Sequence, residues 1–191
     1  PGGGYPVWVG EGALSDAPWP ISDDSRRFVI SDSNVAALYA GDVPQIAGLI
    51  EFEAGEAFKT LETASSVWDA LVQQQVTRAD HVVAVGGGVV GDLAGFCAAT
   101  FQRGVPIVHV PTTLVAQVDS AFGGKTGVDL PQAKNYVGSY HQPAAVLVDP
   151  AKLTTLPADE MAAGYAEVVK TALIGGGLLW ERVSEGQAVD E

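Results

Sequence analysis

Two lysines and an asparagine stand close together in a glycine-rich stretch of an acidic chain. The stretch GGKTGVDLPQAKN, residues 123–135, holds Lys125, Lys134 and Asn135, whereas the whole chain has 10 lysines and arginines against 23 aspartates and glutamates. Lysine neutralises phosphate or carboxylate, and asparagine hydrogen-bonds hydroxyls. A loop of solvent-facing lysines is the alternative, but it would not need the backbone freedom of two glycines before Lys125. The pattern therefore predicts a loop that binds an anion.

A second glycine-rich stretch indicates phosphate binding at the start of a helix. The segment HVVAVGGGVVGD, residues 81–92, is typical of a strand, a tight turn and a helix start, and Gly86, Gly88 and Gly91 satisfy G-x-G-x-x-G. Glycine lets an anion approach the backbone, and the free N–H groups of the first helical turn face it. Tight strand-to-helix turns also use glycine, so this motif alone does not decide the function.

The ribose of a bound dinucleotide would have to be held by residues elsewhere in the chain. The next strand ends in Pro111-Thr112-Thr113 and offers no carboxylate where the usual dinucleotide fingerprint has one. The candidates that remain are polar residues after other strands, namely Asp32, Asn34, Glu56 and Lys59. Each alone is more typical of a turn or a helix cap. Only their joint position at strand carboxyl ends indicates a site.

Further charged residues could act on a substrate. Arg103 follows ATFQ and precedes Gly104, and Asp119 lies in LVAQVDS; arginine can hold phosphate or carboxylate through two hydrogen bonds. The segment GYAEVVK sets Glu167 and Lys170 three positions apart on one helix face. Such a pair is usually a surface pair, but its small and apolar neighbours indicate partial burial. A buried glutamate needs a cation or a metal.

The elements that must position these residues are strands alternating with helices. Strands are predicted over 5–9, 27–31, 81–85, 106–110 and 144–148, and helices over 56–77, from Gly88 to 101, from near Thr112 and after Pro157. Strands that are apolar throughout predict a parallel sheet covered on both faces, and so an α/β fold. Only helical pattern follows residue 150. We therefore expect an α/β domain over 1–150 and the beginning of a helical domain over 151–191, too short for a core of its own.

The composition excludes several classes of protein. With 47% hydrophobic residues the chain can bury a core, and its formal charge of -13 argues against nucleic-acid and anionic-lipid partners. No apolar run is long enough for a membrane span, and no secretory signal is visible. The single cysteine, Cys97, excludes an internal disulfide and a cysteine-rich zinc site, and the histidines are scattered. A cytoplasmic location fits these features.

Three segments together closely resemble the 3-dehydroquinate synthase family, which belongs to the sugar phosphate cyclases. They are GGGVVGDLAGFCAATFQRG (86–104), PTTLVAQVDSAFGGKTGVDLPQAKNYVGSYHQP (111–143) and TLPADEMAAGYAEVVK (155–170). The resemblance implies a Rossmann-like NAD-binding α/β domain followed by an all-α metal-binding domain. It implies cyclisation of 3-deoxy-D-arabino-heptulosonate 7-phosphate to 3-dehydroquinate with phosphate release, in the shikimate pathway of aromatic amino-acid synthesis. NAD is reduced and regenerated in each turnover, and members are commonly homodimers.

The resemblance also implies roles for individual residues. Cofactor contacts are implied for Asp32, Asn34, Gly55, Glu56, Lys59, Gly88, Val89, Val90, Gly91, Asp92, Thr112, Thr113, Lys125, Lys134, Lys152, Leu153, Thr154 and Thr155. Substrate contacts and catalysis are implied for Arg103, Asp119, Lys125, Asn135 and Lys170. Glu167 would be one of three ligands of a divalent metal, zinc or cobalt. In the family the other two ligands are histidines further along the chain, so we expect this chain to be truncated and inactive alone.

Three other functions remain open. Related sugar phosphate cyclases act on other sugar phosphates, although the GGKTG run favours the dehydroquinate enzyme. A glycerol-dehydrogenase-like oxidoreductase shares the fold and the glycine-rich turn, but it would release NADH, whereas a cyclase gives no net NADH. The third is an NAD-binding module without catalytic activity.

Overall fold

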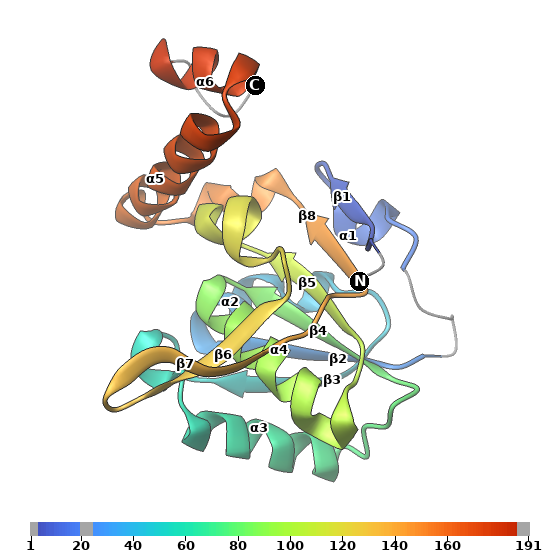
Figure 1. Cartoon of the computed structure of the whole chain (residues 1–191). Helices are drawn as coiled ribbons and strands as arrows, with labels where there is room; N and C mark the ends of the chain where they lie inside the picture. Colours follow the sequence, from blue (N-terminus) through green and yellow to red (C-terminus); the bar gives the residue numbers. More distant parts are fainter. Residues whose placement is uncertain (1–3, 20–24, 187–191) are drawn as a thin grey trace.

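A six-stranded parallel sheet forms the centre of the computed structural model, which describes residues 4–19 and 25–186 (Figure 1). Its strands are β1 (Val7–Val9), β2 (Arg27–Asp32), β3 (Ile46–Phe52), β4 (His81–Gly86), β5 (Ile107–Pro111) and β8 (Ala145–Val148), in the order β1-β8-β5-β4-β2-β3. Runs of β-branched residues make β2, β4, β5 and β8 almost wholly buried. The predicted parallel sheet is confirmed.

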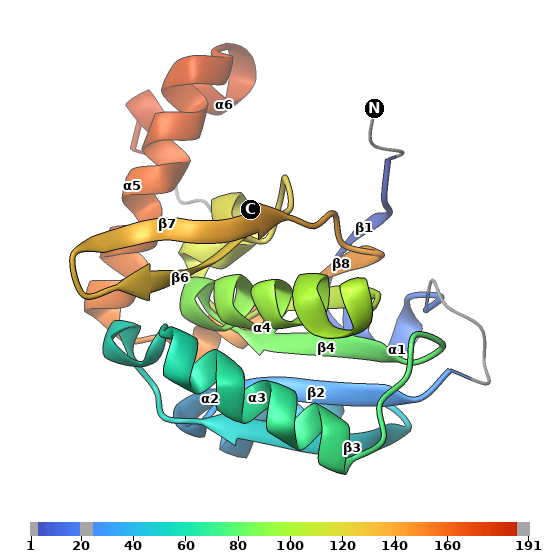
Figure 2. The same cartoon turned by 60° about the horizontal axis from the view of Figure 1, so that its bottom comes forward.

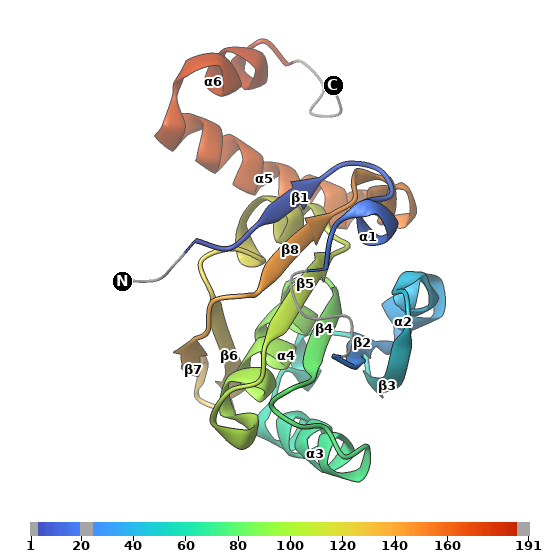
Figure 3. The same ribbon diagram turned by 90° about the vertical axis from the view of Figure 1, so that its right-hand side faces the viewer.

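Helices cover both faces of the sheet (Figures 2 and 3). On one face lie α3 (Leu61–Gln73) and α4 (Gly88–Thr100), and on the other lie α1 (Ala13–Asp16) and α2 (Ser33–Tyr39). Alternation along β2 follows this division, because Phe28 and Ile30 belong to the core under α3 and α4, whereas Val29 belongs to the core under α1 and α2. The α/β architecture is therefore built from two apolar layers around one sheet.

We predicted a loop over the glycine-rich stretch 123–135, and this prediction was wrong. Most of the stretch belongs to a β-hairpin. Strand β6 (Lys125–Leu130) pairs antiparallel with β7 (Ala133–Tyr140), and the hairpin lies over α4 (Figure 2). Glycine serves close packing here, because Gly127 faces Gly138 across the pair and a Cβ at Gly127 would lie 2.8 Å from the carbonyl oxygen of Val137. Reading glycine as a sign of a flexible loop was the error.

Several helical segments differ in extent from the predictions. The helix expected over 56–77 is a short 3₁₀ turn, η2 (Glu56–Phe58), followed by α3, whose first turn is capped by the hydroxyl of Thr60. The helix expected near Thr112 begins at Leu114 and ends as a π-helix, η4 (Ala116–Ser120). Strand β3 was not predicted. The remaining 3₁₀ segments are η1 (Ala40–Asp42), η3 (Phe101–Arg103) and η5 (Pro150–Thr155).

In the described residues after β8, all elements are helical, in agreement with the helical pattern that the sequence predicted after residue 150. They are η5, α5 (Ala158–Gly175) and α6 (Gly177–Ser184), and the last two extend away from the sheet (Figure 1). Helix α5 packs closely on the helical segment before η4, since a Cβ at Gly164 would lie 2.5 Å from that of Leu114. The division into two domains remains a prediction, and residues 1–3 and 187–191 of the predicted domains lie outside the described residues. In the described part of the chain, no helix has the length and apolar character that a membrane crossing requires.

Candidate functional site

A cavity of about 800 Å³ lies at the carboxyl ends of the central strands. Because parallel strands end at the same edge of the sheet, residues that follow β2, β4 and β5 meet there. The predicted cofactor residues that line this cavity are Asp32, Asn34, Gly55, Glu56, Lys59, Gly88, Val89, Asp92, Thr112, Thr113 and Thr155. The structure thus brings most of the predicted cofactor residues together around one space.

The glycine-rich turn between β4 and α4 has the sequence that its packing demands. A Cβ at Gly86 would lie 2.5 Å from Val90, and one at Gly87 would lie 2.9 Å from Thr113, so larger residues would force their neighbours apart. Gly87 is the N-cap residue of α4 and no side chain caps the helix, which leaves N–H groups of its first turn open to the cavity. These N–H groups, together with the helix dipole, make this end of α4 suited to an anion.

Asp32 combines the two roles that the sequence left open. Its Oδ1 accepts hydrogen bonds from the backbone N–H groups of Asn34 and Val35, at 2.9 and 3.0 Å, and so caps α2. The carboxylate also lines the large cavity. It is therefore both a helix cap and a group that can accept a hydrogen bond from a ligand hydroxyl.

A buried lysine, Lys59, contacts several polar side chains of the site. Lys59 is 3% exposed, and its Nζ lies 2.8 Å from Asn135 Oδ1 and 3.3 Å from carboxylate oxygens of both Asp92 and Glu56. Asp129 is a third carboxylate, at 3.8 Å. Burial lowers the pKa of Lys59, but the carboxylates outweigh it and raise the pKa above 10.5. Burial also raises the pKa of Asp92, against the opposing effect of Lys59.

A second cavity, of about 490 Å³, adjoins the first beneath the β-hairpin. Three of the five predicted substrate residues line it, namely Asp119, Lys125 and Asn135. Two residues, Asp92 and Ser120, belong to the walls of both cavities. Ligands in the two cavities could therefore both contact these two side chains.

Helix α5 brings the predicted metal ligand to the same region. Lys170 Nζ lies 3.3 Å from Asp119 Oδ1 and is in direct contact with the carboxylate of Glu167. The hydrogen bond to Glu167, with that to Asp119, raises the pKa of Lys170. The described residues contain no cluster of three or more metal-ligating side chains, so Glu167 is a single candidate ligand in this part of the chain.

Some predicted cofactor residues lie away from the large cavity. Val90 is fully buried in the core, and Gly91 packs against His109 rather than against the cavity. Lys152 Nζ lies 2.5 Å from Asp42 and 4.5 Å from the ring centre of Tyr39, so its side chain contacts η1 and the end of α2. Leu153, Thr154 and Val90 do not line the large cavity, and Thr154 donates to the carbonyl of Ala151.

Two predicted basic residues, Lys134 and Arg103, are exposed and line neither cavity. The side chain of Lys134 is 69% exposed and lies 3.4 Å from Glu56. Arg103 follows the far end of α4, about 20 Å from Gly88 by the rise of an α-helix. It is exposed and lines neither cavity. The structure thus does not bring Arg103 to the other predicted substrate residues.

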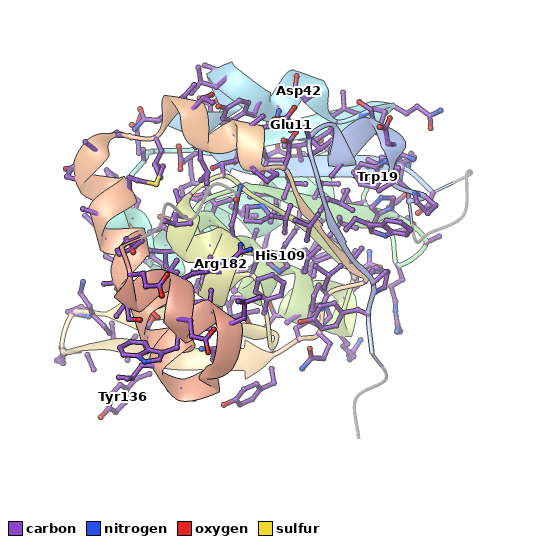
Figure 4. The ribbon with its side chains drawn as sticks, turned by 90° about the horizontal axis from the view of Figure 1, so that it is seen from above. Glu11, Trp19, Asp42, His109, Tyr136 and Arg182 are labelled. Carbon is purple, nitrogen blue, oxygen red and sulfur yellow. The ribbon has the colours of Figure 1, made fainter. Side chains whose placement is uncertain are left out.

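Among the residues that sequence reasoning missed, Tyr39 and Ser120 carry hydroxyl groups that matter for the site. Tyr39 lines the large cavity and its hydroxyl lies 2.6 Å from that of Thr155, which ties α2 to η5. Ser120 lines both cavities, although it is adjacent to Asp119, a residue that the sequence did single out. No spacing signal marks either one. Figure 4 shows His109 in the interior and Tyr136 on the outside of the molecule. Burial lowers the pKa of His109 to about 4, so it is a neutral core residue.

Comparison with known proteins identifies close relatives of this arrangement. The family model described as 3-dehydroquinate synthase N-terminal matches residues 49–163. A 3-dehydroquinate synthase from Halorhodospira halophila is 48% identical over 176 residues, covering 89% of this chain and 49% of that protein. One from Streptococcus sanguinis is 47% identical over 191 residues, covering 95% and 54%. The chain spans about half the length of the curated relatives it matches.

Solved structures with the same fold include sugar phosphate cyclases and dehydrogenases. A 2-deoxy-scyllo-inosose synthase complexed with carbaglucose-6-phosphate, NAD+ and Co2+ is 33% identical, with a TM-score of 0.79 over 87% of this chain and 48% of that one. The 2-epi-5-epi-valiolone synthase of Streptomyces hygroscopicus, with NAD+ and Zn2+ bound, is 33% identical, with a TM-score of 0.80 over 90% and 50%. A probable glycerol dehydrogenase from Sinorhizobium meliloti is 20% identical, covers 88% of this chain and 46% of that one with a TM-score of 0.69, and so shares the fold.

Proposed function

Because the chain belongs to the 3-dehydroquinate synthase family, we propose that it carries the NAD-binding part of an enzyme that converts 3-deoxy-D-arabino-heptulosonate 7-phosphate to 3-dehydroquinate and phosphate. The observation that carries this proposal is the meeting of two cavities at Asp92 and Ser120. One cavity has the open helix N-terminus that suits a diphosphate, and the other has cationic and amide side chains that suit a phosphorylated sugar acid.

NAD is the cofactor that fits the large cavity. The first turn of α4 would bind the diphosphate, and Asp32 and Asn34 would hydrogen-bond ribose hydroxyls from the adjacent strand end. Two similar solved structures contain bound NAD+. When bound, NAD would take a hydride from a substrate alcohol and return it later in the cycle.

The smaller cavity would hold the substrate. Lys125 would neutralise its phosphate or carboxylate, and Asn135 would hydrogen-bond its hydroxyls. Asn135 has a φ of 59° and accepts a hydrogen bond from Lys59, so its amide is held in place before a ligand arrives. Lys170, which Asp119 orients, would add a second cation from α5.

Glu167 is suited to one position in the coordination shell of a zinc or cobalt ion. A carboxylate oxygen is an accepted ligand of either metal, and Lys170 already holds this carboxylate beside Asp119. Further ligands would have to come from outside the described residues. A bound metal would polarise the substrate oxygens. The described residues alone would then not complete the metal site.

The remaining expectations are part of the same proposal. We propose an NAD-binding domain over 1–150 and the beginning of a helical domain over 151–191, acting as a homodimer in the cytoplasm without nucleic-acid or membrane partners. The formal charge of -13 supports the absence of polyanionic partners. Light scattering of the purified chain tests the dimer.

Calorimetry and a fusion protein test the function. We expect the chain to bind NAD in titration calorimetry but to release no phosphate from the heptulosonate phosphate, with either zinc or cobalt present. Joined to the C-terminal half of the Halorhodospira halophila relative, it should release phosphate without net formation of NADH. Lys125→Ala in the fusion is the matched control and should abolish release. Accumulating NADH would instead indicate a dehydrogenase, and NAD binding without turnover in the fusion would indicate a binding module.

A further inference from the structure

Ser120 stands at the junction of the two cavities. It shares this position with Asp92 alone, and the carboxylate of Asp92 is held by Lys59 at 3.3 Å. Among the described residues, none is hydrogen-bonded to the hydroxyl of Ser120. The junction therefore contains one engaged polar group and one that is free to meet a ligand.

The hydroxyl of Ser120 lies directly beside the start of α4. A Cβ added to Gly88 would lie 3.2 Å from Ser120 Oγ, so the absence of a side chain at Gly88 makes room for the hydroxyl. Gly88 and Val89 form the wall of the large cavity at this point. A diphosphate bound at the N-terminus of α4 would thus have Ser120 next to it, on the side of the smaller cavity.

The π-helix η4 fixes this placement. The N–H of Ala121 bonds to the carbonyl of Ala116 at 3.2 Å, a wider turn than that of an α-helix. The buried side chain of Gln117 donates to the carbonyls of Pro111 and Asp149, at 3.2 and 2.9 Å, and so fixes η4 to the ends of β5 and β8. Ser120 is therefore held by the sheet edge itself rather than by a loose loop.

We propose that the hydroxyl of Ser120 hydrogen-bonds the dinucleotide on the nicotinamide side of its diphosphate, at the point where cofactor and substrate meet. This inference rests on the proposed function, because it takes the large cavity as that of the dinucleotide. The end of the cofactor that exchanges hydride must reach the smaller cavity, and Ser120 and Asp92 are the residues that line both cavities. A serine hydroxyl both donates and accepts, which suits a ribose hydroxyl or a carboxamide.

The test compares two nucleotides that differ in the part beyond the diphosphate. NAD and ADP are titrated calorimetrically into the wild-type chain, Ser120→Ala and Ser66→Ala, whose hydroxyl on the outer face of α3 donates to the carbonyl of Glu62. Losing one hydrogen bond should weaken NAD binding to Ser120→Ala by roughly threefold to tenfold. ADP binding should stay within a factor of about two, and Ser66→Ala should match the wild type for both nucleotides.

Each other outcome overturns the inference in a distinguishable way. Equal NAD affinity in Ser120→Ala and the wild type would leave the proposed function standing and remove Ser120 from the cofactor site. Equal weakening of NAD and ADP would assign the hydroxyl to the diphosphate or to the shape of the turn. A wild-type chain that binds neither nucleotide would overturn the cofactor assignment together with this inference. Melting temperatures of the variants and a Ser120→Cys variant of nearly the same shape control for folding.

Discussion

Two clusters of lysine and carboxylate lie at the candidate site and differ in burial; the first lines both cavities, whereas the second reaches the smaller cavity through Asp119. The Lys59 cluster consists of Lys59, Glu56, Asp92, Asp129 and Asn135, and the lysine side chain is 4% exposed. The Lys170 cluster consists of Lys170, Asp119 and Glu167, and its lysine side chain is 46% exposed. The first joins η2, α4 and the hairpin within the α/β unit, whereas the second joins α5 to η4.

The difference in burial separates a structural role from a binding role. Removing water from a lysine is costly, so the Lys59 cluster is stable only with all its partners in place. Exposed ion pairs contribute little to stability, and a ligand can replace them at small cost. We infer that the Lys59 cluster keeps the site in shape and that the Lys170 cluster is the part that can rearrange around a substrate.

Removing the buried lysine should have the largest effect. Lys59→Met leaves Glu56, Asp92 and Asp129 facing an apolar side chain, so the free energy of unfolding should fall by about 3–5 kcal/mol. Urea denaturation at neutral pH measures it. Lys134→Met is the matched control, because Lys134 contacts the same oxygen of Glu56 but is 69% exposed, and it should stay within ~0.5 kcal/mol of the wild type. Equal losses would end the distinction between the two clusters.

The position of the Lys170 cluster should depend on a glycine of α5. In Gly164→Ala the new Cβ would lie 2.5 Å from Leu114 and 2.9 Å from the backbone nitrogen of Val115, so α5 must move or distort. We expect a loss of about 1–3 kcal/mol in the free energy of unfolding. Gly175→Ala in the same helix meets nothing within 4 Å and should be neutral or slightly stabilising in the same denaturation experiment. A neutral Gly164→Ala would indicate that α5 is not fixed on η4.

The pH dependence of stability should identify the charge of Lys59. A raised folded-state pKa means that the stabilisation by Lys59 is fully present below the ordinary lysine pKa of 10.5 and is lost as pH rises through the folded-state pKa. The difference in unfolding free energy between the wild type and Lys59→Met should therefore be constant near neutral pH and shrink at alkaline pH. Titrating groups that do not contact Lys59 are common to both proteins and cancel. A difference that grows with pH would contradict the assignment.

The smallest effect on stability should come from the exposed lysine. Lys170→Met should leave the melting temperature of the chain unchanged in a thermal-shift measurement, because solvent screens its ion pairs. In the fusion protein it should still lower the rate of phosphate release, on the order of 100-fold, if it stabilises charge on the substrate. A large fall in melting temperature with unchanged phosphate release would reverse the roles of the two clusters.

The sequence predicted the parts of the fold that rest on local pattern. Runs such as HVVAV and AAVLV are buried on both faces, so β4 and β8 lie within a residue or two of their predicted bounds. Strand β3 is at the edge of the sheet and mostly exposed, and so it has no continuous apolar run to reveal it. The hairpin was missed because Gly127 and Gly138 permit close pairing of β6 and β7, which cannot be told from loop flexibility in sequence.

Much of the candidate site was predictable for a similar reason. Asp32, Gly88 and Thr112 lie at or just after the carboxyl ends of strands. A parallel sheet brings such residues to one edge, so their meeting can be predicted without knowing how the side chains pack. Ser120 and Tyr39 could not be found in this way, because their places depend on how η4 meets α4 and how α2 meets η5. Motif similarity suggested Arg103 as a substrate residue, but Arg103 follows the far end of α4, is exposed and lines neither cavity.

The pairing of β1 with β8 has a consequence for biosynthesis. Val9 is opposite Val148, so β1 must wait during synthesis for about 140 further residues before its partner exists. At ordinary rates of translation that delay is on the order of 10 s. Until then the β8-facing edge of β5 has unpaired N–H and C=O groups that another nascent chain could bind. Slow closure of this edge leaves the growing polypeptide open to edge-to-edge association until β8 has been made.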